Sequence, residues 1–448
     1  MFHIGTELAR RDEPVHTGVI GAGLFGTNLI EQLESTAGLH ASVVADIDQE
    51  KAVGTLRQAG VDPEDIAIVS DATAANAAIA SGQRAVLEAG AALVDTDIDV
   101  VVEATGLAEA GSFHAYKAIM ADKHVVMATV EAETVVGPIL AELATANDVT
   151  YSMAYGDQPA LIVELIEWAN TVGLEVVAAG KGNPYRPSYR HGGPDNIFER
   201  IGFPEDFVDA YDLNPRMYNS FYDGTKVAVE MCAVANAVGF VPDVSGMHLP
   251  TAEIPEIPEV LRPEREGGIL QNTGVVETVS TIHPDGTPVE RDIGFGVFIV
   301  TTAGSDRIHG YFDRYSGSGL YTASDGAYQL FHRPYHLPGV ETGVSVANAA
   351  LFNQATGSPR IHSTEVVAAA KQDLQEGEEI DGGGGSTVYG TLYAADAATR
   401  AGYVPFELLS GATVTTPISQ DDVLTYDDVE IREDTFLWTL RQLQEHTT

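Results

Sequence analysis

The feature that most constrains how this chain can fold is a glycine-rich turn between an apolar stretch and a helix-like stretch. The apolar run over 15–20 predicts a short buried strand, and the pattern over 24–33 predicts the helix that follows it. A second apolar run over 41–45 ends in Asp46. The turn itself carries Gly21, Ala22, Gly23, Leu24, Phe25 and Gly26. This order is typical of a dinucleotide-binding βαβ unit rather than of a corner that merely needs glycine.

Each glycine has a separate task in that interpretation. Gly21 permits the tight turn, Gly23 lets the backbone approach a pyrophosphate, and Gly26 lets the helix pack closely on the strand. The free N–H groups at the N-terminus of the helix would bind the pyrophosphate. We therefore expect the residues from 21 to 26 to bind a dinucleotide cofactor.

The choice of cofactor depends on the residues after the second strand. The Asp46 carboxylate can bond the hydroxyls of an adenosine ribose, which favours NAD over NADP. Lys51 and Arg57 follow closely enough to accept a 2′-phosphate, so NADP stays an alternative. A further strand ends in Thr105 and Gly106, which form a turn at the carboxyl edge of the sheet, where ligands of such folds bind.

The charge of the chain limits its partners. The 65 acidic and 24 basic residues give a formal net charge of −41, and the carboxylates are spread along the whole chain. Phosphates would be repelled, so the composition argues against nucleic acid and against an acidic membrane surface. Only six residues are lysine. Dispersed acidity with scarce lysine resembles proteins of salt-loving organisms, where salt screens the self-repulsion.

The cysteines, the histidines and the apolar runs limit the kinds of site and segment that the chain can contain. Cys232 is the single cysteine, which excludes an intramolecular disulfide and a cysteine metal cluster. His191, His332 and His336 lack metal-ligand spacing, so we expect no catalytic metal. Residues 1–17 contain no apolar signal core, and no apolar run has the length of a membrane span. We therefore expect a cytoplasmic protein.

The order of strand and helix patterns predicts an α/β protein in three parts. Alternating patterns at the start indicate a Rossmann-like, doubly wound parallel sheet, in which the Ala-rich stretch 72–90 is expected to be one long helical region. A mixed α+β pattern follows, with a polar loop over 180–196. Short strands and turns surround the glycine-rich stretch 381–386. The expected parts are a dinucleotide-binding domain over 1–155, a substrate and catalytic α+β domain over 156–360, and a small β-rich module over 361–448.

An expected helix over 223–238 carries the residues that we regard as catalytic. With a helix that begins near Asp223, the side chains of Asp223, Lys226 and Glu230 fall on one face. The helix is otherwise apolar almost all round, and burying a lysine costs free energy unless it is paired or neutralised. Where lysine is so scarce, Lys226 indicates a task that arginine cannot perform, such as losing a proton. The alternative is a structural ion pair between Lys226 and Glu230, with Asp223 as the helix cap.

Two further groups are candidates for the same site. Lys181 follows a strand and has a glycine on each side, so it is either a catalytic lysine or a surface-loop residue. The loop after it gathers cations, among them Arg186 and Arg190, in an acidic protein. Such a cluster suits a carboxylate or phosphate of a substrate, or it is a loop held in place by carboxylates.

Over nearly its whole length the chain resembles the homoserine dehydrogenase-like oxidoreductases that carry a C-terminal SAF-type module. The segments that carry the resemblance are 21–26, 123–126, 156–159, 180–182, 223–226 and 381–390. The resemblance implies an NAD(P)-dependent hydride transfer between an alcohol and a carbonyl of a small molecule. It also implies that Lys226 is the catalytic lysine with Asp223 beside it, and Asp157 joins the two arginines as an expected substrate-binding residue. We expect a homo-oligomer.

Two departures weigh against homoserine itself as the substrate. Homoserine dehydrogenases carry a lysine shortly after the strand that ends here at 128–129, where this chain has Val130 and Glu131. Their spacing from aspartate to catalytic lysine is also one residue longer than from Asp223 to Lys226. A SAF-bearing branch resembles enzymes that reduce and rearrange a deoxypentulose phosphate, and the arginine loop would suit a phosphorylated substrate.

The expected mechanism follows from the residue types. Lys226 as an ammonium stabilises a developing alkoxide, or, when neutral, takes the alcohol proton, while Asp223 and Glu230 orient it and set its pKa. The competing interpretation is a non-catalytic dinucleotide-binding sensor or assembly protein. Such a protein needs the glycine turn but has no use for Lys226.

Overall fold

The computed structural model describes residues 3–210 and 213–447, which form two compact units. Unit 1 contains the described residues of Met1–Leu161, Leu337–Arg360 and Thr435–Thr448. Unit 2 contains those of Ile162–His336 and Ile361–Asp434. Each unit has a hydrophobic core of its own. The division into three parts at 155 and 360 stays a prediction.

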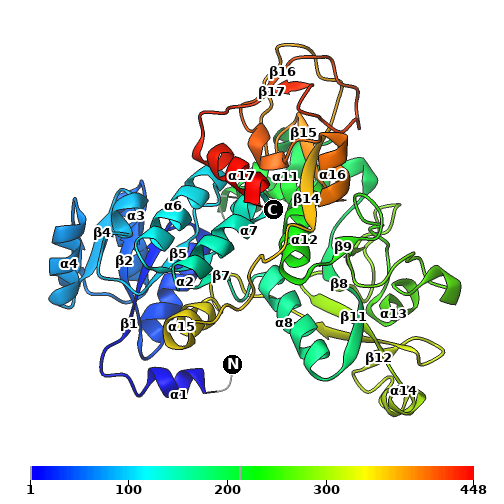
Figure 1. The fold of residues 1–448 in the computed structure, drawn as a ribbon, viewed down its shortest axis with the longest axis horizontal. Helices are drawn as coiled ribbons and strands as arrows, with labels where there is room; N and C mark the ends of the chain where they lie inside the picture. Colours follow the sequence, from blue (N-terminus) through cyan, green and yellow to red (C-terminus); the bar gives the residue numbers. More distant parts are fainter. Residues whose placement is uncertain (1–2, 211–212, 448) are drawn as a thin grey trace. The chain divides into compact units, whose positions relative to one another are not determined.

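Unit 1 is built around a seven-stranded sheet in which all neighbouring strands are parallel, in the order β3-β4-β2-β1-β5-β6-β7 (Figure 1). Its strands are β1 (Val15–Ile20), β2 (Leu39–Ala45), β3 (Ile66–Ile68), β4 (Arg84–Leu87), β5 (Val100–Glu103), β6 (His124–Met127) and β7 (Tyr151–Met153). Because β1 pairs with β2 on one side and β5 on the other, the glycine turn lies at the middle of the carboxyl edge of the sheet. The doubly wound α/β fold expected from the sequence is confirmed.

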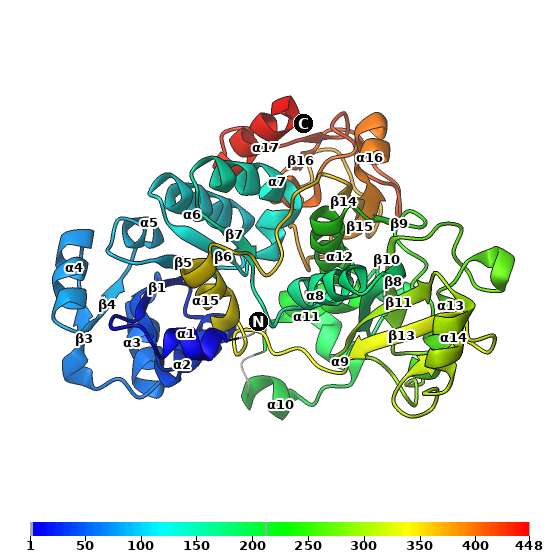
Figure 2. The same cartoon turned by 60° about the horizontal axis from the view of Figure 1, so that its bottom comes forward.

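Helices cover both faces of this sheet (Figure 2). The helices are α1 (Ile4–Leu8), α2 (Leu24–Ser35), α3 (Gln49–Gln58), α4 (Ala72–Ala80), α5 (Gly90–Leu93), α6 (Ala108–Met120), α7 (Val130–Ala146), α15 (Gly343–Phe352) and α17 (Phe436–Thr447). Helices α2, α3 and α15 share one core with β1 and β2. Helix α7 packs against α6, and α17 packs against both. Two late segments of the chain therefore complete the N-terminal unit.

The expectation of one helical region over 72–90 is wrong. Helix α4 ends at Ala80, and Gly82, at φ +83°, turns the chain into strand β4. This strand lies between β3 and β2 in the sheet. The many alanines of the stretch favour helix locally, but pairing with β3 on one side and with the largely buried β2 on the other outweighs that preference.

Unit 2 contains a mixed six-stranded sheet in the order β12-β13-β11-β8-β10-β9 and two short antiparallel pairs, β14-β15 and β16-β17. Its strands are β8 (Leu174–Asn183), β9 (Val241–Pro242), β10 (Val275–Ser280), β11 (Val297–Ala303), β12 (Tyr321–Thr322), β13 (Tyr328–Arg333), β14 (Thr364–Ala370), β15 (Val388–Ala394), β16 (Thr413–Val414) and β17 (Val429–Glu430). Its helices are α9 (Ile197–Ile201), α10 (Glu205–Ala210), α11 (Pro215–Tyr222), α12 (Thr225–Val238), α13 (Ile257–Val260), α14 (Asp306–Asp313) and α16 (Ala395–Ala401). Helix α8 (Gln158–Thr171) begins in unit 1 and leads into this sheet.

Helix α12 is the element that positions most of the candidate site. It contacts β10 of the six-stranded sheet and both strands of the β14-β15 pair. Gly224 at φ +94° precedes it and Gly239 at φ +79° ends it, and both are conformations that favour glycine. Since two layers cover it, nearly all of its side chains are buried, as its apolar sequence predicts.

Strand β8 is longer than the sequence pattern indicates. It continues through Asn183, whereas the sequence predicts that a loop begins at Gly180. Gly180 and Gly182 both lie in this strand, and at each of them a Cβ would collide with backbone. The obstacle is the Glu277 carbonyl at Gly180 and the Ile293 carbonyl at Gly182. The glycines therefore reflect close backbone packing, and Lys181 between them is part of a central strand.

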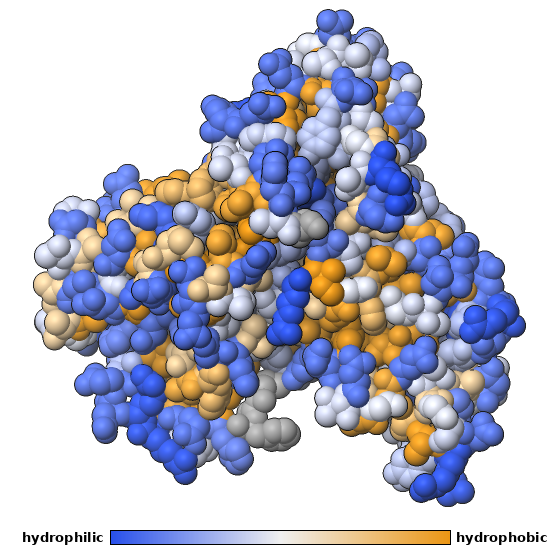
Figure 3. Space-filling view, in the orientation of Figure 1, coloured by the Kyte–Doolittle hydropathy of each residue, from blue (hydrophilic) through white to orange (hydrophobic). Residues whose placement is uncertain are grey.

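The hydrophilic surface expected from the charge is visible on the face drawn in Figure 3, and hydrophobic residues gather there over α8 and β11. Within the described part of the chain, no helix combines the length and hydrophobicity that a membrane crossing requires.

Candidate active site

The glycine turn has the geometry that a dinucleotide pyrophosphate needs. Gly21 has φ +101°, and a Cβ there would lie 2.6 Å from the Ala104 carbonyl oxygen. A Cβ at Gly26 would overlap the carbonyl oxygen of Gly21. At Gly23, which caps α2, no heavy atom lies within 4 Å of an added Cβ. Two glycines are thus required by the fold, while the third opens onto free space at a helix N-terminus and fits a bound phosphate.

Asp46 also holds the turn itself. One carboxylate oxygen accepts a hydrogen bond from the Ala22 N–H at 2.7 Å, and the other accepts from the Asp48 N–H at 2.9 Å. Among the other expected cofactor residues, Leu24 is exposed at the start of α2, whereas Phe25 packs against the core. Asp46 therefore connects the second strand to the glycine turn, and its bond to a ribose stays a prediction.

The second expected cofactor segment is organised by a buried glutamate that sequence analysis missed. Glu103, the fully buried last residue of β5, accepts hydrogen bonds from the hydroxyls of Thr105, at 2.6 Å, and Thr129. The Thr129 oxygen accepts in turn from the Gly106 N–H at 2.9 Å. The carboxylate thus fixes Thr105 and Gly106 at the carboxyl edge of the sheet. Its place at the end of an apolar strand was the signal that could have identified it.

Two of the predicted catalytic residues meet as a buried ion pair in unit 2. Lys181 Nζ lies 2.5 Å from Glu230 Oε2, and both side chains are almost completely buried. Lys226 is half-buried one helical turn before Glu230, and residues four apart share a face of a helix. Lys181 is therefore no surface-loop residue, and it lies at the same face of α12 as Lys226.

The position expected for Asp223 differs from the structure. Helix α12 begins at Thr225, so Asp223 lies outside it and does not share the helical spacing of Lys226 and Glu230. The fully buried Asp223 carboxylate accepts from the Thr225 N–H at 2.8 Å and from Lys371 Nζ at 2.7 Å. Lys371 follows strand β14 and is remote in sequence, which is why local spacing did not reveal it.

The lysines of unit 2 converge on a short stretch of chain. Of the six lysines in the sequence, three belong to unit 2. Lys181 pairs with Glu230, Lys371 pairs with Asp223, and Lys226 lies between these two acids in the sequence. A buried ion pair is seldom a large net gain in stability, so two of them beside a third lysine favour a functional reason.

The loop that follows β8, residues 184–193, is called the arginine loop here. The guanidinium carbon of Arg190 lies 5.4 Å from the ring centre of Tyr185 and 5.5 Å from that of Tyr389. Arg186 lies over Tyr189 at 5.3 Å and donates to the Pro284 carbonyl at 3.1 Å. Within the described residues, neither guanidinium forms an ion pair with a carboxylate, so carboxylates do not hold the loop through these two residues.

The remaining candidate, Asp157, belongs to unit 1 and lies at the start of α8. Its carboxylate accepts from the Gln158 N–H at 2.9 Å. Nearby Glu133 is fully buried, and burial, followed by the charge of Asp157, raises its pKa well above the ordinary range.

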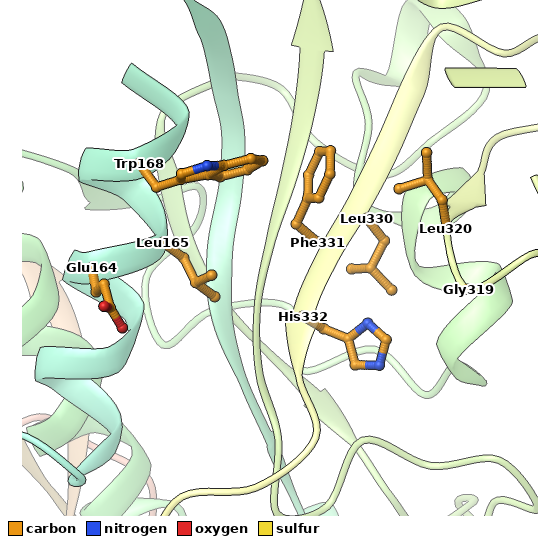
Figure 4. A pocket seen from close by; sticks show the side chains of 8 residues that line it. All are labelled: Glu164, Leu165, Trp168, Gly319, Leu320, Leu330, Phe331 and His332. Atoms are coloured by element: carbon orange, nitrogen blue, oxygen red, sulfur yellow. The ribbon is translucent and has the colours of Figure 1, made fainter. Parts of the chain in front are cut away.

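Outside this site, the described residues include a hollow in unit 2 and no group arranged as a metal centre. Among them, no group of three His, Cys, Asp or Glu side chains is arranged to hold a metal ion. One hollow of about 410 Å³ in unit 2 is lined by Glu164, Leu165, Trp168, Gly319, Leu320, Leu330, Phe331 and His332. Figure 4 shows its largely apolar walls, with Trp168 facing Phe331. None of the predicted site residues lines it.

Three family models match successive parts of the chain. The model for the NAD-binding domain of homoserine dehydrogenase matches residues 21–154. The model described as the catalytic domain of oxidoreductase DRL matches residues 156–342, and the SAF domain model matches residues 365–430. A search of curated proteins finds no match.

Solved structures give more distant likenesses. A probable dehydrogenase from Thermotoga maritima is 13% identical, with 75% of this chain and 88% of that chain covered and a TM-score of 0.36. The 1-deoxy-D-xylulose 5-phosphate reductoisomerase from Zymomonas mobilis, solved with NADPH, is 14% identical over 50% of this chain and 58% of that one, with a TM-score of 0.34. Scyllo-inositol dehydrogenase from Lactobacillus casei is 11% identical over 43% of this chain and 49% of that one, with a TM-score of 0.27. The chain thus spans about half the length of that protein.

The three models together show which kinds of domain the chain resembles. They follow one another along the chain in the order that the motifs predict, and the glycine turn fits a dinucleotide cofactor. The chain therefore carries, in this order, a segment similar to the NAD-binding domain of homoserine dehydrogenase, a segment similar to the catalytic domain of oxidoreductase DRL, and a segment similar to a SAF domain.

Proposed function

We propose that this oxidoreductase acts on the hydroxyl or carbonyl carbon of a small sugar or polyol phosphate, with Lys226 as its catalytic lysine. The observation that carries the proposal is the buried pair of Lys181 and Glu230 on the face of α12 that bears Lys226. Bound NAD(P) supplies the hydride acceptor or donor, and the turn 21–26 with Asp46, Thr105 and Gly106 would hold it. The Asp46 carboxylate favours NAD.

The protein's own part in the reaction is to bind and to move a proton. The Lys226 ammonium stabilises negative charge on the substrate oxygen, or the neutral amine accepts the proton of the alcohol. Glu230 lies one helical turn from Lys226, and its carboxylate is held in position by the hydrogen bond from Lys181. Asp223 anchors the first turn of α12 through the Thr225 N–H and thereby positions Lys226.

Binding of a phosphate group is assigned to Arg186 and Arg190, and Asp157 is a further substrate contact. In a chain with a net charge of −41, an arginine that no carboxylate neutralises is well suited to a dianion. The proposal also includes a homo-oligomer in the cytoplasm of a salt-loving organism, and the acidic composition supports the adaptation to salt.

The test is nicotinamide absorbance in high salt with pools of sugar phosphates, polyols and hydroxy acids, using NAD and NADP separately. We expect turnover with a phosphate-bearing pool, and we expect Lys226→Met to abolish turnover without weakening cofactor binding. Lys117→Met, at a partly exposed lysine that donates to the Ala91 carbonyl in unit 1, is the matched control. Cofactor binding without turnover in any pool would instead favour the sensor interpretation.

A further inference from the structure

The SAF module, defined here as the unit 2 segment Ile361–Asp434, contacts the arginine loop through three side chains. The Tyr389 ring is one of the two rings near Arg190, with its centre 5.5 Å from the guanidinium carbon. Asp421 accepts from Tyr389 at 3.1 Å and lies 2.8 Å from Nε2 of His191, the residue after Arg190. Burial raises the pKa of Tyr389 to about 12, so the hydroxyl keeps the proton that it donates.

Lys371 makes the third connection, and it is the most deeply buried one. Its Nζ donates to the Gly192 carbonyl at 2.9 Å, to the Gly385 carbonyl at 2.6 Å and to Asp223 at 2.7 Å. An ammonium has three N–H donors, and each has an acceptor here. With the side chain only 1% exposed, this arrangement fixes the end of the arginine loop to the start of α12.

The same two carbonyls are held from a second direction. The buried Asn219 on α11 donates its amide to Gly192 at 3.2 Å and to Gly385 at 3.2 Å. The glycine-rich loop of the SAF module and the arginine loop thus accept hydrogen bonds from the same two side chains, Lys371 and Asn219. Because Gly192 and Gly385 point their carbonyls at one ammonium, the two loops cannot separate without leaving buried N–H donors of Lys371 unsatisfied.

The way in which Arg190 is held matters for what it can bind. The Tyr185 and Tyr389 ring centres lie 5.4 and 5.5 Å from the guanidinium carbon and stabilise the cation, and within the described residues no carboxylate forms an ion pair with it. A carboxylate in the same role would neutralise the charge instead. An arginine held by two aromatic rings therefore keeps its charge and loses rotational freedom, which favours affinity for an anion.

We infer that the SAF module is a positioning element of the substrate site: Tyr389 and Lys371 order the arginine loop so that Arg190 is presented to an anionic group of the substrate. The anionic group depends on the proposed function, whereas the ordering of the loop does not. Tyr389 and Lys371 are positioning residues and touch no reacting atom.

The test uses the full-length protein and two readouts besides turnover. Amide hydrogen exchange over residues 184–193 is measured in the wild type, Tyr389→Leu and Tyr393→Leu. The control residue Tyr393 lies on the same strand and packs against Tyr403, away from the arginine loop. We expect exchange about tenfold faster in Tyr389→Leu, because a desolvated cation–π contact is lost, and unchanged exchange in Tyr393→Leu. Lys371→Met should loosen both 184–193 and 381–386.

The second readout is inorganic phosphate, added at constant ionic strength, as a probe of the anion site. We expect phosphate to slow exchange over 184–193 in the wild type, and to lose this effect in Arg190→Gln and Tyr389→Leu but not in Tyr393→Leu. Equal exchange in Tyr389→Leu and the wild type overturns the inference. A loop that loosens selectively in a protein that does not respond to phosphate supports the positioning role and contradicts the phosphate part of the proposed function.

Discussion

At the scale of single residues, the candidate site is defined by which acid each lysine meets. Sequence spacing pairs Lys226 with Glu230 and Asp223, whereas the structure pairs Glu230 with Lys181 and Asp223 with Lys371. Both observed partners are more than 45 residues away along the chain, as 49 and 148 residues separate the pairs. Local periodicity singled out both acids, whose roles stay predictions, but it had no means of identifying the lysines that tertiary packing brings to them.

Gly23 offers a test of the cofactor turn that leaves folding untouched. A methyl group at this position meets no protein atom within 4 Å, and the backbone φ of −70° suits alanine. We therefore expect Gly23→Ala to keep the wild-type unfolding midpoint and to weaken NAD(P) binding at least about tenfold, since the methyl occupies the space of the pyrophosphate. Titration of NADH fluorescence measures the affinity.

A matched control is Gly54→Ala in α3, where a Cβ is equally unobstructed. Its affinity for the cofactor should be that of the wild type. Unchanged affinity in Gly23→Ala would show that the pyrophosphate does not pass this residue.

Glu277 on β10 should make stability depend on pH. Burial raises its pKa from 4.5 to about 6, although the N–H groups of Thr278, His248 and Leu249 donate to the carboxylate and lower it. Between these values the folded state holds a proton that the unfolded chain has released, so the free energy of unfolding falls as the pH rises. As the pH rises from 4.5 to 6, the free energy of unfolding of the wild type should fall by about 2 kcal/mol relative to that of Glu277→Gln.

Urea unfolding at a series of pH values measures this difference. Glu175→Gln, at an exposed glutamate of the neighbouring strand β8, should follow the wild-type pH profile. A Glu277→Gln variant whose stability runs parallel to that of the wild type from pH 4.5 to 6 would contradict the raised pKa.

At the scale of elements, apolar runs and glycine turns placed most strands of the first sheet correctly. Strand β1 has the predicted bounds of 15–20 because both of its faces are buried and its ends are marked by turn residues. Strand β4 was missed because alanine carries little information about whether a segment lies in a sheet. The extension of β8 to Asn183 was missed because glycines mark turns in isolation and close backbone contact in a sheet.

Helix α7 contains a proline, and a distant side chain bonds the backbone beside it. Pro138 has no N–H to donate within the helix. The Gln444 side chain of α17 accepts from Ile139 N at 3.1 Å and donates to the Val135 oxygen at 3.0 Å. We expect Gln444→Leu to cost about 1–3 kcal/mol, since the buried Ile139 N–H loses this acceptor and the Val135 carbonyl keeps only the Arg441 donor, at 3.4 Å.

Chemical unfolding measures this cost. Gln442→Leu, at a half-buried residue of the same helix that bonds Glu445, should change stability by less than about 0.5 kcal/mol. Equal stability of Gln444→Leu and Gln442→Leu would mean that water replaces the bridge.

At the scale of the whole molecule, charge sets the conditions under which the fold is stable. With 65 acidic and 24 basic residues, self-repulsion opposes the compact state. Raising KCl from ~0.1 M to ~1 M shortens the Debye length from ~10 Å to ~3 Å. We therefore expect the thermal unfolding midpoint to rise by roughly 5 °C or more over this range. Differential scanning calorimetry checks it.

Sucrose at the same osmolality is the control, because it stabilises compact states by exclusion but screens no charge. An increase with KCl no larger than the increase with sucrose would contradict a role for charge screening and, with it, the adaptation to salt.

The sequence by itself determined the α/β class, the cofactor turn and the order of the parts, because these depend on periodicity, on glycine conformations and on residues that are neighbours in the chain. It also singled out Lys226, Lys181, Asp223 and Glu230 as candidates, since lysine is so rare here, and their roles in the reaction stay predictions. Only the tertiary structure decided how they pair. Lys181 reaches Glu230 through a central strand, and Lys371 reaches Asp223 from the SAF module. Such pairs arise from strand order and packing, which bring together residues that no local pattern relates.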